Sequence, residues 1–142
     1  MLAQSVLMSL VLVSGPFGLG IVAFPMGPFV GVVLMSIGAL VGIAGTIRLG
    51  TNRTAYPLPR TNARLVQDGI YGFIRHPLYT CLMLLSFGWA IWWGSLPCCL
   101  VSLAMTLLLR FKATLEERHL RRLFPEYKEY QARVPAFFPR LG

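Results

Sequence analysis

The chain of 142 residues is 56% hydrophobic and only 13% charged, with a mean hydropathy of +0.65. Soluble domains carry about 25% charged residues, so this composition excludes an ordinary soluble domain and favours one compact membrane domain over residues 1–142. The net charge of +8 comes from basic residues that border apolar stretches. This pattern is typical of cytoplasmic loops, and we therefore expect the lipid bilayer, and no nucleic acid, as a partner.

The first 47 residues contain no charged side chain. Such a stretch is too long for the apolar region of a signal peptide, which has about 7–15 residues, and long enough for two membrane helices of about 20 residues each. Two prolines and a glycine in residues 24–28 predict a turn between them. We expect an N-terminal helical hairpin over residues 1–48, whose first helix runs to about Phe24 and whose second runs from Pro28 to Arg48.

The second predicted helix is rich in glycine, with Gly31, Gly38, Gly42 and Gly45. In lipid, small residues let helix backbones approach closely. We interpret the glycines as a packing seam, which also allows a homo-oligomer or a larger membrane complex.

A polar, basic segment follows at residues 49–76, and a second helical hairpin is predicted over residues 77–112, with its turn at residues 94–97. The apolar block within this hairpin, residues 77–109, has 33 residues, which are few for two full spans. Either the helices sit shallowly, or the fourth helix continues beyond Lys112 with snorkelling side chains. Four spans and the positive-inside bias place both termini on the cytoplasmic side. We expect the membrane to be a bacterial inner membrane.

Residues 113–142 are predicted to form an amphipathic segment, in which Pro125 restarts the helix because proline is tolerated in a first turn. Its apolar face, at spacings of three and four, comprises Glu116, Leu120, Leu123, Tyr127, Tyr130 and Val134. On this pattern Glu116 points inward, where a cationic group is its natural partner, while Glu117, Arg118 and His119 are solvated. Tyr127 and Tyr130 are expected to be packing residues. The predicted fold is thus an all-α integral membrane protein with four transmembrane helices in two hairpins and an amphipathic cytoplasmic end.

The three cysteines, Cys81, Cys98 and Cys99, have neither C-x-x-C spacing nor a histidine at metal-ligand spacing. We interpret them as small buried apolar residues. Neither a disulfide nor a metal site is predicted.

Two sequence blocks carry a family resemblance. Residues 69–79 read Gly-Ile-Tyr-Gly-Phe-Ile-Arg-His-Pro-Leu-Tyr, and this resembles the G-x-Y-x-x-x-R-H-P-x-Y signature of the isoprenylcysteine carboxyl methyltransferase family and its bacterial relatives. Residues 116–130 resemble the family's E-E-x-x-L-x-x-x-F-G-x-x-Y-x-x-Y ending, with Pro125 in place of the glycine. The resemblance covers roughly residues 58–140.

The resemblance implies a membrane methyltransferase that uses S-adenosylmethionine. It implies that the cofactor is bound by the segment of residues 63–66, including Leu65 and Val66, and by Tyr71, His76, Pro77, Leu78, Tyr79 and Glu116, with Glu116 holding the amino group of the cofactor. Lys112 falls where the family commonly has a substrate-contacting arginine, and Arg110 and Arg75 are further candidates for substrate contact.

Methyl transfer from a sulfonium needs no catalytic nucleophile, because the enzyme gains most by holding donor and acceptor close and excluding water. The sequence contains no motif of a serine or cysteine hydrolase, a metalloprotease, a P-loop or a dinucleotide-binding loop. We expect a hydrophobic or amphiphilic acceptor to enter laterally from the bilayer. Two alternatives stay open: a non-catalytic membrane subunit that keeps the fold, and a nicotinamide-dependent membrane reductase. A structural alternative for Arg75 and His76 is simple solvation at the membrane border.

Overall fold

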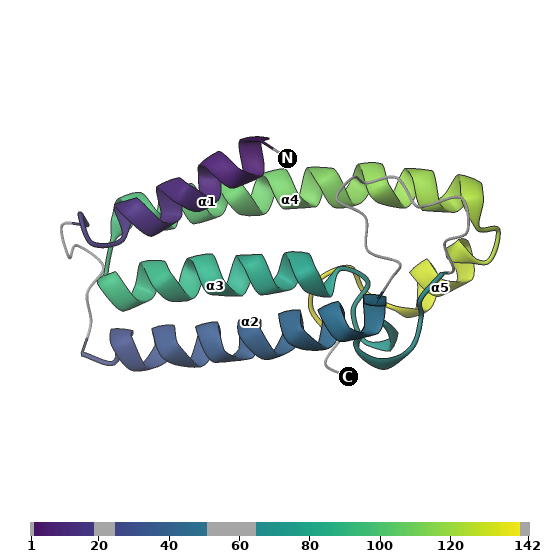
Figure 1. The fold of residues 1–142 in the computed structure, drawn as a ribbon, viewed down its shortest axis with the longest axis horizontal. Coiled ribbons are helices and arrows are strands. Elements are labelled where there is room, and N and C mark those ends of the chain that lie inside the picture. The colour runs from purple at the N-terminus through teal and green to yellow at the C-terminus, as the bar shows by residue number, and fades with distance from the viewer. Residues whose placement is uncertain (1, 19–24, 51–64, 140–142) are drawn as a thin grey trace.

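The computed structural model describes residues 2–18, 25–50 and 65–139. In these ranges the protein is helical and contains no strand. Its elements are α1 (Leu2–Ser14), α2 (Gly27–Leu49), the short 3-10 helix η2 (Gly69–Gly72), α3 (Pro77–Trp93), α4 (Leu96–Leu123) and α5 (Tyr127–Arg133) (Figure 1).

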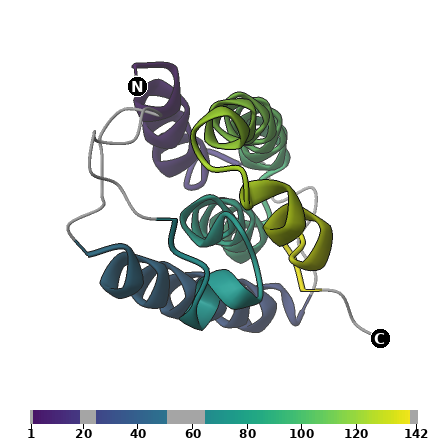
Figure 2. The same ribbon diagram turned by 90° about the vertical axis from the view of Figure 1, so that its right-hand side faces the viewer.

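The central helix of the bundle is α3, which packs against α2 on one side and α4 on the other (Figure 2). Helix α1 lies mainly against α4. Among the described residues, α1 and α2 each have their main packing partner in the second half of the chain, and the N-terminal hairpin of residues 1–48 stays a prediction. Helix α1 also ends at Ser14, earlier than the predicted Phe24, which lies outside the described residues.

The glycine seam of α2 is confirmed, and it explains why α2 and α3 pack so closely. A Cβ atom at Gly31 would lie 2.7 Å from the carbonyl oxygen of Gly88, and one at Gly42 would lie 2.5 Å from Cys81 Sγ. Glycine at these positions permits the backbones to approach each other. Cys81 accordingly occupies space on α3 that Gly42 leaves free.

The ends of α3 and α4 follow local sequence signals. Pro77 begins α3, where a missing N–H costs no hydrogen bond, and Gly94, with φ of +59°, ends it in the left-handed conformation. Ser95 caps α4 by accepting a hydrogen bond from Cys98 N at 3.2 Å. Its hydroxyl also donates to Ser14 O at 2.8 Å, which ties the turn to the end of α1.

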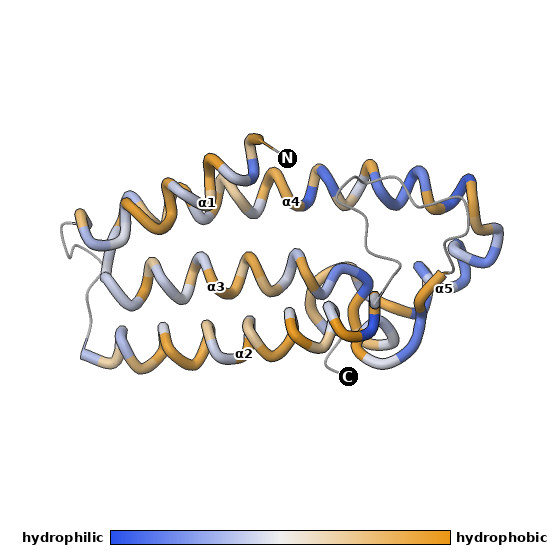
Figure 3. Tube along the Cα trace, in the orientation of Figure 1, coloured by the Kyte–Doolittle hydropathy of each residue, from blue (hydrophilic) through white to orange (hydrophobic). Residues whose placement is uncertain are grey.

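Two described helices are long and apolar enough to cross a bilayer, Gly27–Leu49 and Leu96–Leu123. Helices α1 and α3 are apolar but have only 13 and 17 residues, fewer than the roughly 20 that span the hydrocarbon core. Apolar residues dominate α1, α2, α3 and the first half of α4, whereas polar residues gather toward the end of α4 (Figure 3). The protein has the character of an integral membrane protein, and four full spans stay a prediction.

The fourth helix continues beyond Lys112 to Leu123, as one of the sequence alternatives proposed. The helix is interrupted at residues 124–126, and α5 begins at Tyr127. Tyr127 and Tyr130 are 1% and 3% exposed and pack with Val134, which confirms their packing role.

Candidate functional site

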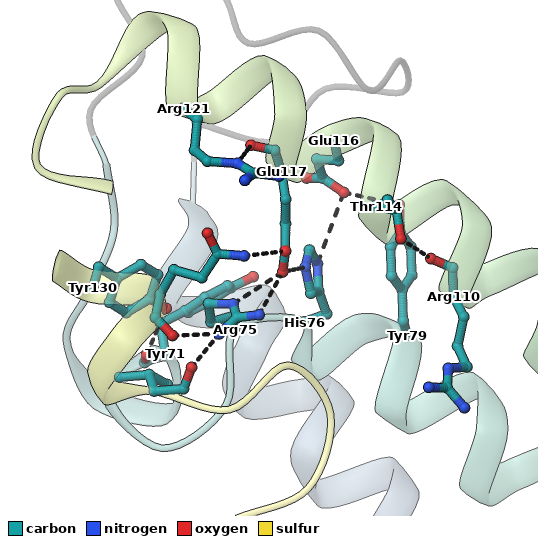
Figure 4. Close-up of polar contacts among 12 residues, drawn as sticks. Tyr71, Arg75, His76, Tyr79, Arg110, Thr114, Glu116, Glu117, Arg121 and Tyr130 are labelled. Atoms are coloured by element: carbon teal, nitrogen blue, oxygen red, sulfur yellow. Dashed lines mark hydrogen bonds and ion pairs between the residues drawn. The ribbon is translucent and has the colours of Figure 1, made fainter. Parts of the chain in front are cut away.

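The polar end of the bundle holds a cluster of ionisable side chains from α3, α4 and the loop before α3 (Figure 4). His76 immediately precedes α3 and is 6% exposed, and the side chain of Arg75 is 9% exposed. Simple solvation of these two residues at the membrane border is therefore excluded. Buried charges are found where they are paired, and the cluster supplies that pairing.

Glu117 is the centre of the cluster. Its Oε1 atom accepts from Arg75 Nε at 2.9 Å and lies 2.8 Å from Arg75 Nη2 and 2.9 Å from His76 Nε2. Its Oε2 atom accepts from Gln131 Nε2 at 2.8 Å. The carboxylate thus joins α4, the start of α3 and α5.

The prediction that Glu117 is solvated is wrong, since the residue is only 7% exposed. The predicted apolar face was assigned from residues 116–134, whereas the buried face of α4 is set by positions that precede Glu116 in the same helix. The buried face of α4 contains Met105, Leu109, Ala113 and Glu117, each four residues after the one before. This spacing is the sequence signal from which the burial of Glu117 could have been predicted.

Glu116 lies on the other side of His76, and its side chain is 31% exposed. Its Oε2 atom accepts from the Tyr79 hydroxyl at 3.1 Å and lies 3.8 Å from His76 Nδ1. The rings of His76 and Tyr79 stack with 5.4 Å between centroids. One carboxylate therefore faces each ring nitrogen of His76, the buried one at bonding distance and the accessible one further away.

The candidate substrate residues separate in space. Lys112 Nζ lies 5.6 Å from the centroid of the Tyr79 ring, so Lys112 adjoins the cluster. It also donates to Gln4 Oε1 at 2.5 Å, which connects α1 to this end of α4. Arg110 is exposed, and its side chain points away from Glu116 and His76 in Figure 4. Arg75 uses its guanidinium within the protein, since Nη1 donates to Gln131 O at 2.9 Å and also to Val134 O.

The segment after α5 covers the cluster. Arg75 N donates to Pro135 O and His76 N to Ala136 O, each at 2.9 Å. Thr80 Oγ1 donates to Phe137 O at 2.7 Å, and the Phe137 ring lies 5.7 Å from that of His76. Backbone pairing with the chain end thus fixes the residues that precede α3.

Tyr71 is buried in η2 and is tied to α5, because the Tyr130 hydroxyl donates to Tyr71 O at 2.6 Å. Burial raises the pKa of Tyr130 above its ordinary value, and burial likewise raises the pKa of Tyr127. Both phenols consequently stay protonated over the physiological range, as this donated hydrogen bond requires.

Of the remaining predicted cofactor residues, Leu65 packs against the buried tyrosines of α5 and Val66 is half-buried. Pro77 is buried and Leu78 half-buried at the start of α3. Ala63 and Arg64 lie outside the described residues. In the described part of the chain no group of three histidine, cysteine or acidic side chains has the arrangement of a metal site.

An open apolar groove of about 220 Å³ lies beside the cluster, between α2, η2, α3 and the segment after α5. Phe137 lines it and also contacts the His76 ring. The other lining residues are Ile37, Val41, Ile70, Phe73, Ile74, Thr80, Leu84, Phe138 and Pro139. The polar cluster thus has a hydrophobic surface next to it.

The protein thus has a buried polar cluster at the polar end of a bundle of apolar helices. Comparison with known proteins identifies the protein family. The model of the phospholipid methyltransferase family matches residues 26–127, and the chain belongs to this family. The sequence resemblance to an isoprenylcysteine carboxyl methyltransferase-like membrane methyltransferase family is thereby confirmed.

Two curated relatives have names that refer to metal resistance. The chain is 40% identical over 119 residues to the cobalt-zinc-cadmium resistance protein CzcN of Cupriavidus metallidurans, an alignment that covers 82% of this chain and 54% of that protein. It is 38% identical over 85 residues to the nickel-cobalt-cadmium resistance protein NccN of Alcaligenes xylosoxydans xylosoxydans, covering 58% of this chain and 39% of the relative. The matched region is therefore about half of these relatives or less.

The fold is that of a solved intramembrane enzyme. The eukaryotic intramembrane Ras methyltransferase ICMT, isoprenylcysteine carboxyl methyltransferase, superposes with a TM-score of 0.73 over 97% of this chain and 51% of that one. At 21% sequence identity this comparison shows a shared fold.

Proposed function

We propose that the protein is an S-adenosylmethionine-dependent membrane methyltransferase that transfers a methyl group to a hydrophobic or amphiphilic acceptor. The observation that carries the proposal is the arrangement of His76, Tyr79 and Glu116 at the polar end of the bundle, in a chain of a methyltransferase family. These are polar groups that a purely packing role does not require.

The donor set fits the cofactor. S-adenosylmethionine carries an ammonium, a carboxylate and a sulfonium, and it supplies an electrophilic methyl group when bound. Glu116 is partly accessible, and among the described residues its polar neighbours are the Tyr79 hydroxyl and His76 Nδ1 at 3.8 Å. A carboxylate with free acceptor positions suits a cationic amino group. Leu65, Val66, Tyr71, His76, Pro77, Leu78 and Tyr79 are proposed to complete the cofactor site.

The protein's own contribution is position and exclusion of water. Stacking on Tyr79 and the hydrogen bond to Glu117 hold His76 in one orientation. Lys112, and less directly Arg110, are proposed to contact the acceptor. Arg75 is proposed to act by fixing the chain around His76, because Glu117 and two backbone carbonyls already engage its guanidinium.

The apolar groove supports a lipophilic acceptor. It lies among helices that include the potential span α2, and Phe137 lines it and also contacts the His76 ring. An acceptor with an apolar chain would place that chain among aliphatic and aromatic side chains and its polar end toward the cluster. The proposal fails for this acceptor class if the purified protein methylates only fully water-soluble compounds.

Calorimetric binding of S-adenosylhomocysteine to the detergent-solubilised protein tests the cofactor. We expect saturable binding that His76→Ala and Glu116→Ala abolish, while His119→Ala, at a half-buried position outside the cluster, preserves it. Labelled nicotinamide dinucleotide serves as the competing ligand, since its binding would favour the reductase alternative. Absence of binding to folded wild-type protein would favour the non-catalytic subunit.

The names of both curated relatives suggest a cellular setting in metal resistance. We infer that methyl transfer by this chain contributes to growth under cobalt or cadmium stress. In a strain lacking the gene, complementation by wild-type protein but not by Glu116→Ala would support this role. Equal complementation by both would separate any resistance function from the proposed reaction.

A further inference from the structure

We propose that Glu117 is a positioning residue that fixes the hydrogen of the neutral His76 ring on Nε2 and thereby presents Nδ1 to the ligand. This inference rests on the proposed function in assigning the ligand side, whereas the position of the hydrogen depends on the chain alone. Glu117 was expected to be solvated, and the family resemblance implied no role for it.

The first step is the chemistry of the hydrogen bond. Glu117 Oε1 lies 2.9 Å from His76 Nε2, and an ionised carboxylate can only accept. Two guanidinium nitrogens of Arg75 lie 2.9 and 2.8 Å from the same oxygen, which favours the ionised form of Glu117. The hydrogen of this bond therefore belongs to His76 Nε2.

The second step is the contrast between the two glutamates. Glu116 Oε2 is 3.8 Å from His76 Nδ1, beyond hydrogen-bond distance, and the Glu116 side chain is 31% exposed against 10% for Glu117. The more exposed of the two carboxylates thus lies on the Nδ1 side of the imidazole. A ring held by Nε2 presents Nδ1 as a hydrogen-bond acceptor beside Glu116 and the Tyr79 hydroxyl.

The third step is the fixed position of the Glu117 carboxylate. Gln131 from α5 donates to the second oxygen of Glu117 at 2.8 Å, so the carboxylate is held from both sides. His76 is in turn clamped by its backbone bond to Ala136 and by stacking on Tyr79. Rotation of the ring would break the bond to Glu117, so the chain selects one ring orientation as well as one tautomer.

Nitrogen-15 NMR of histidine-labelled, detergent-solubilised protein tests the assignment directly, because protonated and unprotonated ring nitrogens have widely separated shifts. The chain has only two histidines, and His119→Gln assigns the His76 signals. At about pH 9, where an ordinary imidazole is neutral, we expect a protonated Nε2 and an unprotonated Nδ1 in wild type. A protonated Nδ1, or a rapidly averaged mixture, overturns the proposal without need of any variant.

Two matched variants test the role of the carboxylate. Glu117→Gln replaces an acceptor by a group whose amide can donate to Nε2, and we expect the hydrogen to move at least partly to Nδ1. Glu117→Asp, which keeps the carboxylate, should retain the wild-type tautomer, and Glu129→Gln, at an exposed position of α5, should leave the spectrum unchanged. An unchanged His76 spectrum in a folded Glu117→Gln protein contradicts the proposal.

Addition of S-adenosylhomocysteine connects the tautomer to the ligand. We expect the Nδ1 resonance of wild type to shift more than that of Nε2, and the dissociation constant to rise at least about tenfold in Glu117→Gln but less than twofold in Glu129→Gln. A larger shift at Nε2 contradicts the assignment of the ligand side. If wild type binds no S-adenosylhomocysteine while its Nε2 carries the hydrogen, the proposed function fails and the positioning of His76 by Glu117 stands.

Discussion

Arg75 and Glu117 form a buried ion pair, with 2.8 Å between Nη2 and Oε1, that joins the loop before α3 to the last turns of α4. The side chains are 9% and 10% exposed. A buried pair is weak evidence for stability, but removal of one partner leaves an uncompensated charge, which typically costs about 3–5 kcal/mol. The pair therefore makes the architecture of the site dependent on a single arginine.

We predict that Arg75→Ala lowers the free energy of unfolding by about 3 kcal/mol or more, because it removes the guanidinium that pairs with the buried Glu117 carboxylate and donates to two backbone carbonyls. Arg122→Ala, at an exposed position of the same polar end, serves as the control and should change it by less than about 0.5 kcal/mol. Denaturant unfolding in detergent, followed by circular dichroism, measures both. Equal stability of the two variants would show that the pair is dispensable.

The close approach of α2 and α3 leads to a prediction about methyl-sized additions. At Gly31 the added Cβ would meet the backbone of Gly88 and Trp92 at 2.7 and 2.9 Å, whereas at Gly42 it would meet mainly the Cys81 thiol. Backbone cannot move aside, so Gly31→Ala should destabilise by about 1–3 kcal/mol and more than Gly42→Ala. Melting temperatures in detergent give the comparison, and the reverse order would contradict the packing.

The sequence predicted the membrane class, the glycine seam and the boundaries of α3, because those features depend on local composition, helix caps and small residues. It did not predict that α1 packs on α4, since any uncharged helix presents similar apolar faces to several partners. The roles of the two glutamates were only partly resolved. Glu116 was expected to face inward and lies beside His76. The burial of Glu117 was not predicted, because it follows from the earlier buried positions of α4, Leu109 and Ala113, and not from the pattern that begins at Glu116.

Tyr79 offers a way to separate its hydroxyl from its ring. Tyr79→Phe removes the hydrogen bond to Glu116 and keeps a ring that stacks on His76 and lies beneath Lys112. A hydrogen bond to a charged group contributes about 1.5 kcal/mol or more, so we expect roughly tenfold weaker binding of S-adenosylhomocysteine. Tyr79→Leu, which removes the ring as well, should weaken it further in the same calorimetric titration. Unchanged affinity in Tyr79→Phe would show that the hydrogen bond between the Tyr79 hydroxyl and Glu116 does not contribute to cofactor binding.

Lys112 is expected to affect the acceptor more than the cofactor. It is held by Gln4 and by the Tyr79 ring, and Glu116 is one helical turn further along α4. For an anionic acceptor, Lys112→Gln should raise KM at least about fivefold and change the dissociation constant of S-adenosylhomocysteine less than twofold. Arg118→Gln, which removes an exposed charge from α4, is the control, and an equal effect of both variants would indicate only a general electrostatic attraction.

The buried tyrosines of α5 predict a loss of stability in alkaline solution. Burial raises the pKa of Tyr127 and Tyr130 in the folded protein, whereas in the unfolded chain a tyrosine titrates near pH 10. Above that pH the unfolded state releases protons that the folded state retains, so the stabilisation is complete below about pH 10 and declines as the pH rises.

Tyr130→Phe removes one of these groups and the hydrogen bond to Tyr71. We expect it to be less stable than wild type at pH 8 but to lose less stability between pH 9 and pH 11, as melting temperatures across that range will show. A parallel decline in both proteins would mean that Tyr130 ionises as readily in the folded state as in the unfolded one, which its burial and its hydrogen bond to Tyr71 contradict.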